Sequence, residues 1–343
     1  MLRTTSSSIL RAAAAAVSVI SCLPKDTRPP PGSLEVTATA DPALLGGTRS
    51  IATSDGWTIS YDRFLISISS QLSGDSTCAM YYTDGYRRIF DMGFPGPQRV
   101  NLLYALGHCD FGFRVASADT DPLEPLGEGV TLADKNLMGT GDTDFYTREP
   151  TGIALYAKGK ATKGDVTKTF TWSFRQRISY QRCAAPAAPG DAAGVDDAAG
   201  VDDAAGGDAE LDANVLTGPQ GVDLAGGETK SVDIRIHGET LFLDSTDPSK
   251  GALRFDAIAA ADDTSGDHDG DVTLLELHTS LLSDISVPGR YQQPPPSAGA
   301  AVPDSGTAAW TTLEDFVYLG LVPQVARFED KGTCSINPRR GGD

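Results

Sequence analysis

Apolar and polar residues alternate along much of residues 33–183, as they do in half-buried β-strands. The alternation is clearest in five stretches: 36–39, 57–61, 64–68, 153–157 and 170–174. Lys163, Gly164 and Asp165 supply turn residues between the last two stretches, so we predict a hairpin there. One short helix is predicted over 131–138. Many short strands with glycine-rich turns indicate a β-sandwich or a barrel-like domain.

Helical spacing of apolar residues begins in the last third of the chain. Residues 231–236 still alternate as a strand, which residues 240–243 could extend. Apolar residues then recur every third or fourth position in two stretches: 253–259 and 274–282. Thr311-Thr312-Leu313-Glu314 has a capping-box pattern and predicts a last helix that ends before Pro323. We therefore expect a small α/β domain over 215–343 and a mixed, β-rich fold for the whole chain.

A segment of different composition separates these two patterns. Ten acidic residues and no basic ones lie between Ala184 and Thr229, and the hexapeptide Gly-Val-Asp-Asp-Ala-Ala occurs at Gly194 and again at Gly200. Small and acidic residues offer too little apolar surface to offset the entropy lost on ordering. Residues 184–214 are therefore predicted to be a disordered linker, extended by the repulsion of its own charges.

The formal net charge of the chain is −18. Nucleic acids and anionic lipid surfaces bind proteins through basic patches. This charge therefore argues against a nucleic-acid partner.

Residues 1–21 have the pattern of a secretory signal peptide, because Arg3 and Arg11 precede a short apolar run and small residues precede Cys22. The run is too short to span a membrane permanently. Residues 19–22, Val-Ile-Ser-Cys, resemble the bacterial lipobox. The resemblance implies that Cys22 carries lipid, becomes the first residue of the mature chain and anchors the protein to a membrane.

The residues after Cys22 indicate where that anchor lies. Residues 22–32 include three consecutive prolines and would form a stiff tether. In Gram-negative bacteria, an Asp directly after the lipidated cysteine resembles a signal for retention in the inner membrane. This chain has Leu23 at that position. We therefore expect a cell-envelope protein on the outer membrane of such a bacterium.

Four cysteines follow the predicted anchor. They are Cys78, Cys109, Cys183 and Cys334. None belongs to a CxxC pair, which disfavours a zinc site or a thioredoxin-like motif. Outside the cytoplasm disulfides persist, so we expect two of them, with three possible pairings.

Closely spaced acidic residues surround Gly270 between the two helical patterns. The segment Asp267-His268-Asp269-Gly270-Asp271 resembles the loop of an EF-hand, in which about twelve residues between two helices hold calcium. Placing Gly270 at position six implies the following ligands: Asp267, Asp269, Asp271 through its carbonyl, Thr273 through water, and Glu276. Glycine permits the sharp turn that this loop requires.

Two residues are candidates for the first calcium ligand of this loop. Ser265 occupies the first position of the motif, where the family has Asp. Asp262 would supply a carboxylate if the loop were three residues longer. With either residue the calcium affinity should be modest, with a Kd of roughly 10⁻⁴ to 10⁻³ M.

Catalytic motifs are not evident in the sequence. His108 is followed by Cys109, but a disulfide at that cysteine would remove the nucleophile. We therefore predict a non-enzymatic cell-envelope lipoprotein that binds calcium as a structural ion. The alternatives are a surface ligand-binding or adhesion module and an extracytoplasmic hydrolase with dispersed carboxylates. The sequence identifies no protein or glycan partner.

Aromatic residues of 33–183 could form either the core of the sheet or a carbohydrate-binding face. Their alternation with polar residues favours the core. The residues concerned are Trp57, Tyr61, Phe64, Tyr81, Tyr82, Trp172 and Phe174.

Overall fold

The computed structural model describes residues 29–45, 50–74, 76–82, 87–118, 126–139, 142–143, 150–186, 220–264, 266–294 and 309–339. The predicted signal peptide, Cys22, most of the predicted linker and Ser265 lie outside the described residues.

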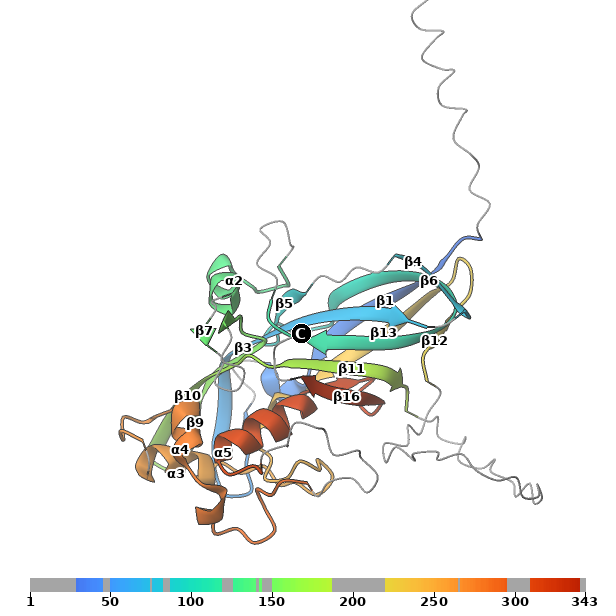
Figure 1. The fold of residues 1–343 in the computed structure, drawn as a ribbon. Coiled ribbons are helices and arrows are strands. Elements are labelled where there is room, and N and C mark those ends of the chain that lie inside the picture. Colours follow the sequence, from blue (N-terminus) through green and yellow to red (C-terminus); the bar gives the residue numbers. More distant parts are fainter. Residues whose placement is uncertain are drawn as a thin grey trace, which may run out of the picture. The chain divides into compact units, whose positions relative to one another are not determined.

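The described chain is β-rich, with one large mixed sheet and few helices (Figure 1). The sequence prediction of a β-rich fold is therefore confirmed. The main path of the sheet runs β14-β10-β9-β3-β6-β1-β13-β15. These strands are β1 (Gly32–Ala40), β3 (Thr58–Ser73), β6 (Gln98–Val115), β9 (Leu155–Lys163), β10 (Val166–Phe174), β13 (Thr229–Ile236), β14 (Asp271–Val272) and β15 (Ala326–Phe328).

Shorter strands extend this sheet beside the main path. They are β2 (Ile51–Ala52), β4 (Cys78–Tyr82), β5 (Arg88–Asp91), β11 (Arg177–Ala184), β12 (Val222–Leu224) and β16 (Thr333–Arg339). A separate two-stranded sheet contains β7 (Asp142–Thr143) and β8 (Pro150–Thr151).

The long strand β6 joins two parts of the large sheet. Its first half pairs with β1, its middle pairs with β4 and β12, and its last residues pair with β3 and β11. One strand therefore changes partners along its length, which allows the sheet to curl around a shared core.

Helices are short and lie mostly in the last third of the chain. They are α2 (Leu132–Gly139), α3 (Asp256–Thr264), α4 (Leu274–Thr279) and α5 (Leu313–Asp315), which continues as the π-helix η6 (Phe316–Leu321). The 3₁₀ helices are η2 (Pro42–Leu44), η4 (Gly238–Phe242), η5 (Leu282–Asp284) and η7 (Val322–Gln324). None of the described helices is long and apolar enough to cross a membrane.

Local sequence patterns predicted several of these elements. The hairpin is confirmed as β9 and β10, and the helix predicted over 131–138 is confirmed as α2. The last helix starts one residue later than predicted, because Thr312 and Asp315 form the capping box. The extension of the strand through 240–243 is wrong. This segment forms η4, whose residues Leu241 and Phe242 are buried and whose amides bond to carbonyls three residues back.

Strands from both sides of the predicted linker pair with each other. β13 lies parallel to β1, with Ser33 opposite Thr229 and Ala40 opposite Ile236. β16 pairs with β11, β12 pairs with β6, and β14 pairs with β10. The described residues from Pro31 onward form one compact unit, whereas the sequence pattern predicts two domains.

Aromatic side chains fill the centre of this unit. They come from the first segment, the described residues before the predicted linker (29–183), and from the second segment, those after it (220–339). The Phe170 ring lies 4.9 Å from Trp172, 5.6 Å from Phe242, 5.7 Å from Tyr61 and 6.3 Å from Phe255, measured between ring centroids. Such tilted and edge-to-face contacts add to the free energy gained by burying the rings.

The interpretation of the aromatic residues as core is confirmed for most of them. Five are buried: Trp57, Tyr61, Phe64, Trp172 and Phe174. Tyr82 is the exception that is clearly exposed, with half of its surface accessible to solvent.

Two disulfides connect the four cysteines, as the sequence analysis expects. Cys78 is joined to Cys109, and Cys183 is joined to Cys334. The second bond closes a loop of 151 residues that contains the predicted linker, whereas the first closes a loop of 31. It therefore covalently ties the two segments together.

We predict that removing the longer disulfide destabilises the protein more than removing the shorter one. Loop-closure entropy gives roughly 5 kcal/mol for the Cys183–Cys334 bond and roughly 4 kcal/mol for the Cys78–Cys109 bond. Urea unfolding of Cys183→Ala/Cys334→Ala and Cys78→Ala/Cys109→Ala, each against the oxidised protein, measures the difference. An equal or larger loss in the second variant would contradict the prediction.

Candidate metal centre

The acidic loop lies between α3 and α4, and side chains from the chain before the predicted linker hold the start of α3. Oδ2 of Asp55 accepts hydrogen bonds from the amides of Phe255 and Asp256, each at 2.8 Å. Nε1 of Trp57 donates to Oδ1 of Asp256 at 2.7 Å. The first amides of a helix have no partner within it, so Asp55 caps α3 from a distant part of the chain.

The end of the loop is fixed on the central sheet. β14 pairs in parallel with β10, and the Thr169 amide donates to Gly270 O at 2.8 Å. Val272 is fully buried, and its carbonyl accepts a hydrogen bond from Nε1 of Trp172 at 2.9 Å. In Figure 1, α3 and α4 accordingly lie beside β9 and β10.

Two glycines allow the chain to turn tightly inside the loop. Gly270 has a φ of +87°, a backbone conformation that residues with a Cβ atom rarely adopt. A Cβ atom at Gly266 would lie 1.9 Å from Oε1 of Glu276, so the backbone passes directly against this carboxylate. Glu276 also completes a capping box with Thr273 at the start of α4.

Three of the predicted ligands come together in the structure. Asp262, Asp267 and Asp269 each place a carboxylate oxygen within 4.8 Å of the others. Asp262 is fully buried, while Asp267 and Asp269 are exposed. Oδ1 of Asp262 is buried and has no hydrogen-bond partner among the described residues.

The remaining predicted ligands lie around this group. Thr273 and Glu276 line an open pocket of ≈ 560 Å³ together with Asp267 and Asp269. Oδ1 of Asp271 accepts a hydrogen bond from Oγ1 of Thr169 at 2.7 Å, so this side chain is held at the sheet. Ser265, the other candidate for the first ligand, lies outside the described residues.

Lys168 is part of this site and was missed by the sequence analysis. Its Nζ donates to Oδ2 of Asp262 and, at 2.6 Å, to Oδ1 of Asp263. Lys168 is only 7% exposed and points to the same side of β10 as Phe170 and Trp172. A lysine in phase with buried aromatic residues is the signal that could have indicated a buried carboxylate partner.

The lysine controls the charge state of Asp262. Burial alone would raise the pKa of this carboxyl, but the hydrogen bond and charge of Lys168 and the Gly270 amide outweigh burial and lower the pKa. Asp262 is therefore ionised at neutral pH. Its Oδ2 accepts a hydrogen bond from Lys168, and its Oδ1 has no hydrogen-bond partner among the described residues.

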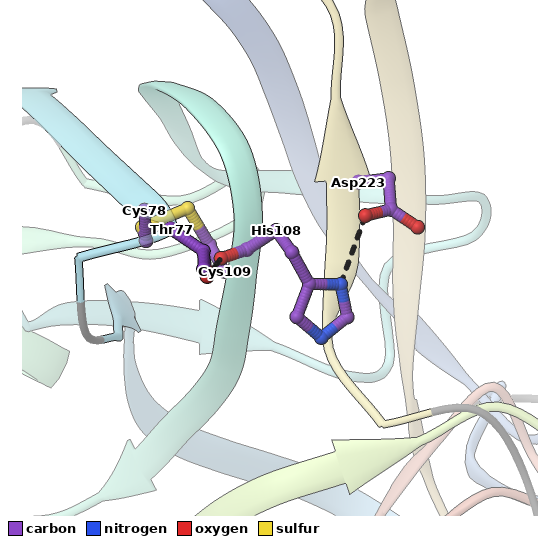
Figure 2. The surroundings of a disulfide bond; sticks show 5 residues. All are labelled: Thr77, Cys78, His108, Cys109 and Asp223. Atoms are coloured by element: carbon purple, nitrogen blue, oxygen red, sulfur yellow. Dashed lines mark hydrogen bonds and ion pairs between the residues drawn. A yellow bond between two sulfur atoms is a disulfide. The ribbon is translucent and has the colours of Figure 1, made fainter.

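The pairing of His108 with Cys109 in sequence does not produce a catalytic dyad. Cys109 is bonded to Cys78, and Figure 2 shows the His108 ring turned away from the disulfide toward Asp223. Nδ1 of His108 lies 2.9 Å from Oδ1 of Asp223, and both side chains are exposed. This cysteine therefore has no free thiol for nucleophilic chemistry.

Comparisons of the chain with protein-family models, with curated proteins and with solved structures give no match.

We predict that Lys168→Met destabilises the protein by about 3 to 5 kcal/mol near neutral pH, because it leaves Asp262 buried without a cation. Lys163→Met is the matched control, since Lys163 pairs with Asp256 at an exposed position. Its cost should be at most about 1 kcal/mol. Urea unfolding of both variants measures the difference, and similar losses in the two would be inconsistent with a buried pair.

The loss in Lys168→Met should shrink in acid. In the parent protein the lowered pKa of Asp262 contributes stability above its unfolded-state pKa, and this contribution disappears as the pH falls through the folded-state value. Without the lysine, burial dominates and protonation of Asp262 relieves the variant. Unfolding at about pH 7 and about pH 4 should therefore give a smaller difference at the lower pH.

Proposed function

We propose that this chain is an exported cell-envelope lipoprotein without catalytic activity, whose 262–276 loop binds calcium as a structural ion. In this proposal the loop is EF-hand-like, and α3 and α4 are its flanking helices. Lipid on Cys22 anchors the protein to the outer membrane of a Gram-negative bacterium.

The unpartnered oxygen of Asp262 carries the calcium proposal. A buried charged oxygen without a hydrogen bond is costly, and a cation beside it removes that cost. Asp262, whose Oδ1 has no hydrogen-bond partner among the described residues, belongs to the group that Asp267 and Asp269 complete. Because Lys168 engages Oδ2, the lysine and a bound ion can share the carboxylate without exchanging places.

The chemistry of the donors favours calcium over transition metals. The three grouped side chains offer only carboxylate oxygens, and Thr273 and Glu276 add oxygen at the pocket. Hard oxygen ligands suit calcium, whereas zinc and copper sites usually include imidazole or thiolate. The open pocket leaves room for water to complete the coordination.

A structural role follows from where the loop is attached. The loop connects α3, which Asp55 caps, to β14, which pairs with β10. Calcium would stabilise the folded form of this connection, since a ligand that binds only the folded state raises stability. The two disulfides support the proposed location, because disulfides persist in oxidising compartments outside the cytoplasm.

We predict that about 10 mM calcium raises the free energy of unfolding by about 1.4 to 2.7 kcal/mol, given a Kd of roughly 10⁻⁴ to 10⁻³ M. Glu276→Gln should reduce this gain while keeping the capping box, since Gln can replace Glu there. Asp267→Asn/Asp269→Asn should abolish it. Thermal and urea unfolding in calcium and in chelator measure the effect.

Two controls separate a specific site from general screening of the net charge of −18. Asp284→Asn removes an exposed carboxylate outside the loop and should keep the full calcium effect. Magnesium at the same concentration should give a much smaller gain. If the loop variants and Asp284→Asn respond to calcium alike, the site does not exist as proposed.

The anchor has its own test. In a Gram-negative host, the full chain should incorporate labelled fatty acid and sediment with outer membranes. Cys22→Ala should lose the label and leave the membrane fraction, because lipid attachment supplies the binding energy. Unchanged sedimentation and labelling of Cys22→Ala would refute the anchor while leaving the calcium proposal intact.

A further inference from the structure

A second group of metal-ligating side chains lies where β1 and β13 end together. Parallel pairing places Ala40 opposite Ile236, so Asp41 and His237 follow at the same edge of the sheet. The Asp41 amide donates to Ile236 O at 2.8 Å, which holds the two ends side by side. The 3₁₀ helix η4 begins directly after His237 and brings Glu239 back beside it.

The three side chains converge on the Nδ1 face of the imidazole. Nδ1 of His237 is hydrogen-bonded to Oε1 of Glu239 at 2.9 Å and lies 3.8 Å from Oδ2 of Asp41. One donor atom from each residue lies within 4.8 Å of the other two. Ligands about 2.1 Å from a tetrahedral zinc ion stand about 3.4 Å apart, so these separations suit a single small ion.

A fourth carboxylate faces the opposite ring nitrogen. Oδ1 of Asp330 lies 3.1 Å from Nε2 of His237, although the geometry is not that of a hydrogen bond. His237 is only 7% exposed, and Oε2 of Glu239 is also buried without a hydrogen-bond partner among the described residues. Nε2 of His237 and Oε2 of Glu239 are thus buried polar atoms without a hydrogen-bond partner in the described part of the chain.

The cluster carries more negative charge than its described surroundings neutralise. Among the described residues, the ion pairs of Asp41, Glu239 and Asp330 involve only His237, and no lysine or arginine contributes. This differs from the acidic loop, where Lys168 supplies a cation.

A neutral imidazole cannot satisfy all of these neighbours. It has one N–H donor and one lone pair, while carboxylates only accept. With the proton on Nδ1, the ring donates to Glu239 but the lone pair of Nε2 faces Asp330. With the proton on Nε2, the lone pair of Nδ1 points toward two carboxylates. A cation on that side removes the repulsion. Asp330 lies on the Nε2 side of the ring, where a carboxylate commonly orients a metal-bound histidine, and a small rotation of its side chain would align it with the Nε2–H bond.

We propose that Asp41, His237 and Glu239 bind one first-row transition-metal ion, with Zn²⁺ as the simplest occupant, and that Asp330 positions the imidazole. Zinc binds both imidazole nitrogen and carboxylate oxygen, so these three side chains offer it a mixed ligand set. Side chains of Asp41 and Glu239 are about one quarter exposed, so an ion and water can reach the site from solvent. The proposal does not depend on calcium binding at residues 262–276.

Zinc titration of the chelator-treated full chain tests the site. Isothermal calorimetry with saturating calcium present should show one zinc ion per chain, and Co²⁺ should give the visible absorption of a low-coordinate nitrogen and oxygen site. His237→Gln should weaken binding at least tenfold and remove the Co²⁺ band. His108→Gln is the matched control and should change neither, because His108 lies on the surface beside Asp223.

Further variants keep the test decisive if His237→Gln fails to fold. Asp41→Asn retains an oxygen for the Ala43 amide that Asp41 caps, and Glu239→Gln preserves the side-chain size. Both should lower zinc affinity at least tenfold. Asp330→Asn should weaken binding by about 10 to 100-fold and shift the ring proton of His237 between its nitrogens in the NMR spectrum of the metal-free protein.

Three results would overturn the proposal. One is the absence of zinc binding up to about 100 μM, far above the concentrations at which structural zinc sites fill. Another is binding that His108→Gln removes and His237→Gln leaves unchanged. The third is an NMR spectrum in which both ring nitrogens of His237 stay protonated in excess zinc, which would identify a buried imidazolium paired with carboxylates.

Discussion

Eight residue pairs hold β13 parallel to β1, although the two strands lie nearly two hundred residues apart in the sequence. In this ladder Leu34, Val36 and Ala38 of β1 lie beside β13. The β13 residues Ile234 and Ile236 are fully buried, as are these three. It also fixes where the next residues lie. η4 follows β13 directly and carries Phe242 into the aromatic core, so the core of the first segment is completed by the second.

Features encoded by neighbouring residues could be predicted from the sequence. The β9–β10 hairpin and α2 each depend on a few consecutive residues whose spacing and turn chemistry are visible in the chain. The partner of each strand could not be predicted, because a two-residue period identifies a strand but not its neighbour. Residues 240–243 likewise resembled a strand in the sequence. In the structure Leu241 and Phe242 are buried on the 3₁₀ helix η4 instead.

The two candidate sites show the same limit. Asp262, Asp267 and Asp269 lie within eight residues of each other, so their spacing alone indicated a common centre. Lys168 reaches that centre from β10, and only its position among inward-facing aromatic residues could have indicated a partner. Asp41 and His237 meet through the β1–β13 ladder, and nothing near either residue in the sequence indicates the other.

The separation of β1 and β13 also constrains the order in which the protein can fold. Contacts between distant residues must overcome the entropy of closing a long loop, and folds dominated by such contacts form slowly. During synthesis, β1 has no parallel partner until residue 236 has been added, so one edge of the first segment stays open. The earlier segment therefore cannot finish folding by itself, and the chain depends on staying unaggregated until its second half arrives.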